Sequence, residues 1–267
     1  VGDVETPSRR DPGRRTKRIS QRAISSSVAD HPDRVLGKCS PGRHELSICE
    51  RFTVYDGRHA GCTASQSGAI LIMLTVAYLA NEFPSAVEPY VAEEIAELRR
   101  RGVRVVGGSV WKPVADEASE RRYLPEIVVW PMSGMVQLRA LRLCLVRAKH
   151  ILPLMSRVAF QGREGFLKRL KALAHTWLGA CYAVLLERSG VEHIHVHHGY
   201  LGSWIAMVAA RLLGVNYSMT LHGSDLLLHA PYLDVKLAQC AFCLTVSEYN
   251  RNCILERYPK IGAENVV

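Results

Sequence analysis

Residues 191–225 have the sequence VEHIHVHHGYLGSWIAMVAARLLGVNYSMTLHGSD, which joins two strand patterns through an apolar helix pattern. Apolar and polar residues alternate over residues 194–197 and again over residues 215–221, as they do in strands. Between them, residues 203–213 are apolar almost all round, and Gly214 can adopt the left-handed conformation that ends a helix. The segment therefore predicts a strand–helix–strand unit of a parallel sheet.

Polar residues and glycines follow both strand patterns of this unit. His197 and Gly199 come at the end of the first strand, while His222, Gly223 and Asp225 follow the second. Ligands of open parallel sheets bind outside the carboxyl ends of the strands. We therefore expect these residues to line a ligand site. Two structural alternatives remain open, in which His222 and Asp225 cap the helix that follows.

Upstream of this unit, strand and helix patterns continue to alternate. The apolar run over residues 69–80 predicts a buried strand, because a bilayer span needs about 20 residues. Residues 103–106 and 124–130 predict two more strands. This alternation predicts an α/β fold with a doubly wound, mostly parallel Rossmann-like sheet. The helix expected before Gly102 has an apolar stripe made of Val87, Val91, Ile95 and Leu98 and a water-facing side with Glu93, Glu94, Glu97, Arg99 and Arg100.

The stretch from residue 135 to residue 189 is helical in pattern and basic. It predicts two helices whose apolar stripes pack on the core while lysines and arginines face water. The alternative is a membrane-facing surface that attracts anionic lipid. The first stripe consists of Leu138, Leu141, Leu145, Ala148 and Leu152, with Arg139, Arg142 and Lys149 on another face. The second consists of Phe166, Leu170, Leu173 and Trp177, beside Lys168, Lys171 and His175.

Composition divides the chain of 267 residues into two parts. Residues 1–68 carry many arginines among Pro, Ser and Asp and few large apolar residues, which predicts a disordered basic extension. A nucleic-acid-binding arm is the alternative, but no aromatic residues are interleaved with the basic residues of positions 9–18 for base stacking, so no nucleic-acid partner is expected. Residues 69–267 are expected to form the folded domain. The formal net charge of +9 is also compatible with an anionic membrane surface or a phosphorylated substrate.

The eight cysteines show no regular spacing. Together with the absence of a leader pattern at the start, they indicate free thiols in a reduced cytoplasm. Peripheral attachment of the protein to the inner face of the membrane is compatible with this location. Cys240 and Cys243 form a C-x-x-C pair. Because neither a second pair nor a histidine at zinc spacing lies nearby, they are expected to be packed thiols.

The histidines also suggest a metal site. His195 and His197 fall on one face of a strand, His198 follows them, and His222 and Asp225 could complete a metal-dependent hydrolase site. Hydrolase barrels of that kind usually place the first His-x-His near the start of a much longer chain, whereas three strand patterns precede it here. We therefore expect no bound metal.

A set of residues occurs in an order that is typical of one enzyme family. The set is His195, His197, Gly199, an apolar helix, Thr220, His222, Gly223 and Asp225. It resembles the N-terminal half of family-four glycosyltransferases, retaining enzymes with the GT-B architecture. Residues 74–102 resemble the opening strand, acceptor loop and first helix of members that build bacterial exopolysaccharides and lipopolysaccharides. Phe83, Pro84 and Glu88 match the acceptor loop, but Pro89 and Tyr90 replace the usual Thr-Phe pair.

Residues 244–250 resemble the last strand of the same N-terminal domain. The resemblance implies transfer of a sugar from a nucleotide-sugar co-substrate, without another cofactor, to a saccharide or lipid-linked acceptor. It implies a catalytic role for His222, which in the family lies against the donor sugar. It implies substrate binding by Asn81, Glu82, Glu88, His197, Gly199, Gly223, Asp225 and Ser247.

A GT-B enzyme has two domains, and we expect the donor-binding domain to follow Val267 or to be a separate partner. The chain alone is then expected to be inactive. Two alternatives remain open, namely a noncatalytic Rossmann-like binding or interaction module and the metal-dependent hydrolase.

Overall fold

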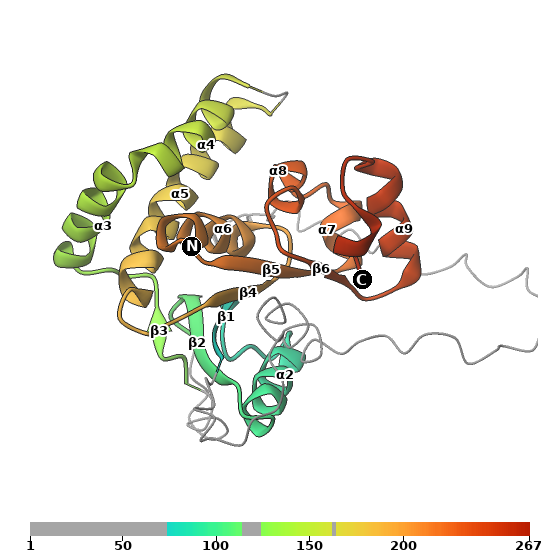
Figure 1. Ribbon diagram of the computed structural model, residues 1–267, viewed down its shortest axis with the longest axis horizontal. Coiled ribbons are helices and arrows are strands. Elements are labelled where there is room, and N and C mark those ends of the chain that lie inside the picture. The colour runs from blue at the N-terminus through green and yellow to red at the C-terminus, as the bar shows by residue number, and fades with distance from the viewer. Residues whose placement is uncertain (1–73, 114–123, 162–163) are drawn as a thin grey trace, which may run out of the picture. The chain divides into compact units, whose positions relative to one another are not determined.

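Six parallel strands form one open sheet in the computed structural model, which describes residues 74–113, 124–161 and 164–267 (Figure 1). The strand order is β3-β2-β1-β4-β5-β6, and every neighbouring pair runs parallel. This is the order of a doubly wound Rossmann-like sheet, so the predicted fold class is confirmed. The strands are β1 (Thr75–Glu82), β2 (Arg104–Trp111), β3 (Ile127–Val128), β4 (His193–His197), β5 (Asn216–Leu221) and β6 (Cys243–Thr245).

Helices cover both faces of the sheet. Alternate residues of β1 point to opposite sides, so Val76 and Tyr78 pack with α2 while Ala77 and Leu79 pack in the larger core that contains α5 and α6 (Figure 1). The helices are α2 (Pro89–Arg100), α3 (Gly134–Val146), α4 (Ala148–Phe160), α5 (Phe166–Leu186), α6 (Leu201–Leu213), α7 (Gly223–Leu227), α8 (Leu233–Leu237) and α9 (Glu248–Arg257), followed by a 3-10 turn at Ala263–Asn265.

All described residues belong to one compact unit of the chain, Glu45–Val267. The basic extension expected over residues 1–68 lies outside the described residues. Among the helices that the structure describes, none has both the length and the apolarity needed to cross a bilayer.

The predicted strand–helix–strand unit is β4, α6 and β5. Almost all of α6 is buried, because it lies between the sheet and α5. At the crossing of α5 and α6 the backbones approach so closely that a Cβ on Gly179 would lie 2.6 Å from Cβ of Val208. Trp204 of α6 donates its indole N–H to Oγ1 of Thr176, 2.9 Å away in α5. The helix ends at Gly214 with φ +77°, as its place in the sequence predicts.

The first predicted helix is α2, with one correction. Val91, Ile95 and Leu98 are buried as expected, but Val87 is 84% exposed and precedes the helix. The reason is that Pro89 occupies the first turn, where its fixed φ suits a helix start and its missing N–H costs nothing. The strands also differ in length from the prediction, since β2 extends to Trp111 and β3 contains only Ile127–Val128.

The stretch from residue 135 to residue 189 contains three helices where two were predicted. A break at Arg147 separates α3 from α4, and no glycine or proline marks it in the sequence. The prediction that the leucine stripe of α3 packs on the core is wrong, since Leu138 is 64% exposed and Leu145 is 70% exposed. Ala140 faces the core instead, together with the partly buried Val136 and Leu143, which leaves the leucines of the predicted stripe in solvent.

Candidate functional site

The sheet changes its direction of winding between β1 and β4. We call the group of residues at the carboxyl ends of these two strands and of β5 the crevice, after the place where open parallel sheets bind ligands. The chain leaves β1 toward α2 on one face of the sheet and leaves β4 toward α6 on the other. Their connections therefore diverge at the carboxyl ends of the strands, which is where doubly wound sheets bind ligands. Glu88 precedes α2 and His198 follows β4, so both connections bring an ionisable side chain to this point.

His198 joins residues of both connections in the crevice. Its ring lies 3.0 Å from Oε1 of Glu88, 3.5 Å from Oδ2 of Asp225 and 3.3 Å from the hydroxyl of Tyr90. The hydrogen bonds to Asp225 and Glu88 raise the pKa of His198 to about 9, so the ring is cationic at neutral pH. Its backbone is left-handed, with φ 65°. Such a conformation is uncommon outside glycine and is held here by the surrounding contacts.

Asp225 joins the turn after β4 to the start of α7. Its fully buried carboxylate accepts hydrogen bonds from the amide N–H groups of Gly199 and His222, each at 2.8 Å. Burial acts to raise the pKa of Asp225, but the hydrogen bonds from His198 and from these two amides outweigh it and lower the pKa. Asp225 lies inside α7, and the N-cap position belongs to His222. The suggested N-cap role of Asp225 is therefore corrected, although its carboxylate still satisfies free amides.

His222 lies against two other histidines of the crevice. Its ring stacks on that of His198 with a centroid separation of 4.4 Å, and its Nε2 lies 3.5 Å from Nδ1 of His197. Burial lowers the pKa of His222, and the neighbouring charges of His198 and His197 lower it further. The crevice thus holds a neutral, partly exposed His222 beside a cationic His198 at neutral pH.

Two residues of α2 belong to the site although the sequence analysis placed neither there. Oε2 of Glu94 lies 2.8 Å from Nε2 of His197, so the expectation that Glu94 faces water is wrong. The sequence could have predicted that Glu94 faces the protein, because it falls on the same helical stripe as the buried Val91 and Ile95. Tyr90 stands where the resembling family has another residue, and its ring packs against those of His197 and His222.

A row of buried polar side chains continues from the crevice along β4 and β5. The hydroxyl of Ser218 lies 2.7 Å from Nε2 of His193 and 2.7 Å from Nδ1 of His195. The other ring nitrogen of His195 lies 3.1 Å from Oγ1 of Thr220. Burial lowers the pKa of His193 to about 3 and that of His195 well below its ordinary value, so both rings are neutral.

Three potential metal ligands come together in this row. Donor atoms of Glu94, His195 and His197 all lie within 4.8 Å of one another. Hydrogen bonds already engage them, since both nitrogens of His195 contact hydroxyls and Nε2 of His197 contacts Glu94. Protein hydrogen bonding therefore accounts for the cluster without an ion.

The other residues predicted for the site lie at strand ends with different surroundings. Oδ1 of Asn81 is buried near the end of β1 and has no hydrogen-bond partner among the described residues. Glu82 is the last residue of β1 and is partly buried. Gly223 begins α7, directly after His222. Ser247 is the N-cap of α9, and its hydroxyl accepts a hydrogen bond from the amide of Asn250 at 3.2 Å.

A buried lysine supports the turn that carries His198. Nζ of Lys236 donates to the carbonyls of Gly199, Tyr200 and Pro231 at 2.6, 3.0 and 2.9 Å. These bonds use all three donors of an ammonium group, while burial lowers the pKa of Lys236 to about 7. The sequence pattern gave no sign of this role, because the contacts join residues far apart in the chain.

The C-x-x-C pair is packed as the sequence predicts. Cys240 and Cys243 are both free thiols, and Cys243 is fully buried in β6. Burial raises the pKa of Cys240 to about 12 and that of Cys243 well above its ordinary value. Thiols in this state have little nucleophilic character at neutral pH.

No protein-family model matches the chain, and no curated protein sequence matches it either. Its function is therefore inferred from the crevice itself. The described residues give a Rossmann-like α/β fold, which hosts many unrelated activities.

Proposed function

We propose that this chain is the acceptor-binding domain of a retaining glycosyltransferase. In this proposal it acts together with a donor-binding domain, which supplies the nucleotide-sugar, and the acceptor is a saccharide or a lipid-linked saccharide. The observation that carries the proposal is the convergence of His222, His198 and Glu88 at the switch point of the sheet. This convergence brings hydrogen-bonding groups of opposite charge to the edge where such sheets bind ligands.

The electrostatics of the crevice suit a reaction in which an oxocarbenium-like centre develops. A neutral imidazole at His222 donates a hydrogen bond to a substrate oxygen without carrying a charge that would oppose the positive sugar ring. The cationic ring of His198 is compensated by the carboxylates of Glu88 and Asp225, so in this proposal the groups that neutralise the departing phosphate come from the donor-binding domain.

The acceptor side of the crevice would be formed by the connection after β1. The unpaired Oδ1 of Asn81 and the carboxylate of Glu88 are hydrogen-bond acceptors suited to sugar hydroxyls. In this proposal Gly223 leaves room next to His222, since a Cβ on Gly223 would meet nothing within 4 Å. Gly199 binds substrate only through its backbone, because a Cβ there would face the core side chains Leu221, Ala230 and Leu233. His197 orients the ring of His222 through their 3.5 Å contact and is itself held by Glu94.

A noncatalytic binding module is the second candidate. This function is favoured by the ion pairs of the crevice, since His198 already pairs with both Glu88 and Asp225. A module that only holds a ligand needs no reactive group at His222. Loss of transfer without loss of acceptor binding in a His222 variant therefore separates the two functions.

The test is a transfer assay on the chain joined at Val267 to the donor-binding domain of a family-four enzyme, with uridine, guanosine and thymidine diphosphate sugars as donors. We expect labelled product, and we expect His222→Ala to lower kcat by about a hundredfold with little change in acceptor KM. The matched control is His150→Ala, because His150 lies in α4 outside the crevice. Undiminished transfer by His222→Ala would contradict the catalytic assignment.

A further inference from the structure

The side of α3 that faces away from the core is apolar. Leu138 is 64% exposed and Leu145 is 70% exposed, whereas Ala140 on the opposite side is fully buried. Such a stripe is larger and more regular than the scattered apolar residues found on ordinary protein surfaces. We call this surface the α3 face, and it consists of Met135, Leu138, Leu141, Leu145 and Val146.

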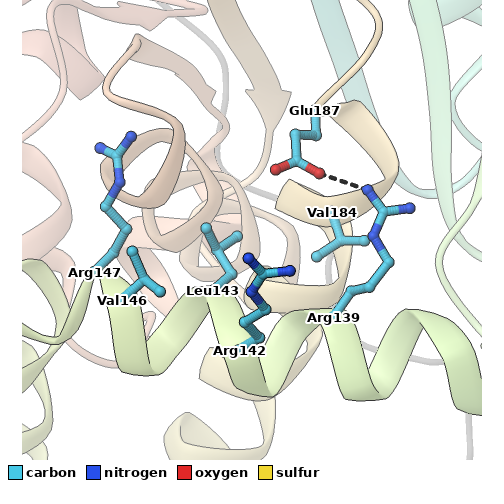
Figure 2. A pocket seen from close by; sticks show the side chains of 7 residues that line it. All are labelled: Arg139, Arg142, Leu143, Val146, Arg147, Val184 and Glu187. Atoms are coloured by element: carbon cyan, nitrogen blue, oxygen red, sulfur yellow. Dashed lines mark hydrogen bonds and ion pairs between the residues drawn. The ribbon is translucent and has the colours of Figure 1, made fainter.

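Arginines interrupt and border the α3 face. Arg139, Arg142 and Arg147 line a pocket of about 330 Å³ between α3 and α5, together with Leu143, Val146, Val184 and Glu187 (Figure 2). Arg139 is paired with Glu187 at 2.6 Å. Within the described part of the chain, neither Arg142 nor Arg147 has an ion-pair partner for its guanidinium group. Among the described residues the pocket therefore offers two cations without an ion-pair partner, and their guanidinium groups point to different places along the pocket, where each can contact a phosphate (Figure 2).

The end of α4 and the start of α5 also combine exposed apolar residues with basic ones. Phe160 at the end of α4 is 84% exposed, and the first two turns of α5 expose further apolar residues next to lysines. Large aromatic and aliphatic side chains beside basic ones are typical of helices that lie in a membrane interface. The residues are Phe166, Leu167 and Leu170, with Lys168 and Lys171.

We propose that the α3 face docks on a membrane that contains anionic phospholipid. The leucines enter the boundary between headgroups and acyl chains, and Arg142 and Arg147 contact lipid phosphates at the pocket. Charge complementarity favours this occupant, since an anionic bilayer satisfies both the apolar stripe and the free arginines. A second copy of the chain fits less well, because Arg142 lies within the stripe and would meet like charge across a symmetric interface. This inference does not depend on the proposed sugar transfer.

The experiment is flotation of the full chain with vesicles. One set contains phosphatidylcholine alone and the other an equal mixture of phosphatidylcholine and phosphatidylglycerol. We expect binding to the mixed vesicles and little to the neutral ones. Two double variants, Leu138→Ser with Leu145→Ser and Arg142→Glu with Arg147→Glu, should each lower the partition coefficient by about tenfold or more.

Matched controls show whether the loss belongs to the α3 face. Val87→Ser removes an exposed apolar residue outside the α3 face, and Arg104→Glu reverses an exposed arginine at the start of β2. Both controls should bind as the parent chain does, and all variants should keep its melting temperature, since the changed side chains are exposed.

Three outcomes would overturn the proposal. The parent chain could fail to bind the mixed vesicles. Binding could persist in both double variants, which would assign it to charges elsewhere, such as the arginines of residues 1–68. The leucine variants could instead dissociate an oligomer, measured by analytical ultracentrifugation, without changing vesicle binding, which would assign the α3 face to a second copy.

Discussion

The ring of His198 lies 3.0 Å from the carboxylate of Glu88, although 110 positions separate the two residues in the sequence. The contact ties the connection after β1 to the connection after β4 across the switch point of the sheet. An ion pair at this place positions both connections and sets the charge of the crevice. The stability and the ligand binding of the chain should therefore both respond to it.

We expect the contribution of His198 to stability to disappear at high pH. Its pKa is raised in the folded protein from 6.5 to about 9, so the folded state keeps a proton that the unfolded state loses between these values. The stabilisation, on the order of 2 kcal/mol, is complete below about pH 6.5 and is lost as the pH rises through about 9. His198→Asn removes the charge, and asparagine tolerates the left-handed backbone.

Urea unfolding of the parent and of His198→Asn at several pH values measures this difference. Comparison of the two proteins cancels the titration of other groups, including Lys236. A difference in the free energy of unfolding that stays constant from about pH 6 to about pH 9.5 would contradict the assignment.

Asp225 is expected to be the carboxylate of the crevice that matters most for stability. Asp225→Ala leaves the buried amides of Gly199 and His222 without an acceptor, which should cost about 2–4 kcal/mol of unfolding free energy. Asp225→Asn keeps one acceptor oxygen and should cost less. The matched control is Asp234→Ala, since the side chain of Asp234 is half exposed and its ion pair with Arg157 should contribute no more than about 1 kcal/mol. Equal effects of Asp225→Ala and Asp234→Ala in chemical denaturation would refute the role of Asp225.

The central unit of the fold could be predicted from the sequence because its signals are local. Alternation marked β4 and β5, continuous apolarity marked α6, and Gly214 marked its end. The exposed stripe of α3 could not be predicted in the same way. Leucines at helical spacing give the same sequence pattern whether they pack on a core or face solvent. In α3 the orientation of the helix follows from the packing of Ala140 on the core, which is a tertiary contact.

The candidate site was predicted in part for a similar reason. The ends of the strands can be predicted from the sequence, so His222, His197 and Asp225 were expected at one edge of the sheet. The partner of His197 is Glu94 of α2, and no local pattern joins these two residues across 103 positions. The left-handed backbone of His198, which directs its ring toward Glu88 and Asp225, is likewise a product of the tertiary fold.

Protein purified without an affinity tag is expected to contain no stoichiometric zinc, iron or manganese. The nitrogens of His195 are both hydrogen bonded to hydroxyls, so a metal would have to displace buried contacts. Elemental analysis by plasma mass spectrometry checks this expectation. An equimolar metal that is lost in His197→Ala, but retained in the control His150→Ala, would revive the hydrolase alternative.

The most direct test of the central claim is a titration of the histidine ring signals by NMR with a panel of saccharides and lipid-linked saccharides. The account predicts that at least one acceptor shifts the ring signals of His198 and His222 and saturates them, with a Kd between about micromolar and millimolar. It predicts that Glu88→Gln weakens this Kd by about tenfold, and that the signals of His150, outside the crevice, do not move. If no member of the panel perturbs the crevice, or if Glu88→Gln binds as tightly as the parent chain, the crevice is not an acceptor site.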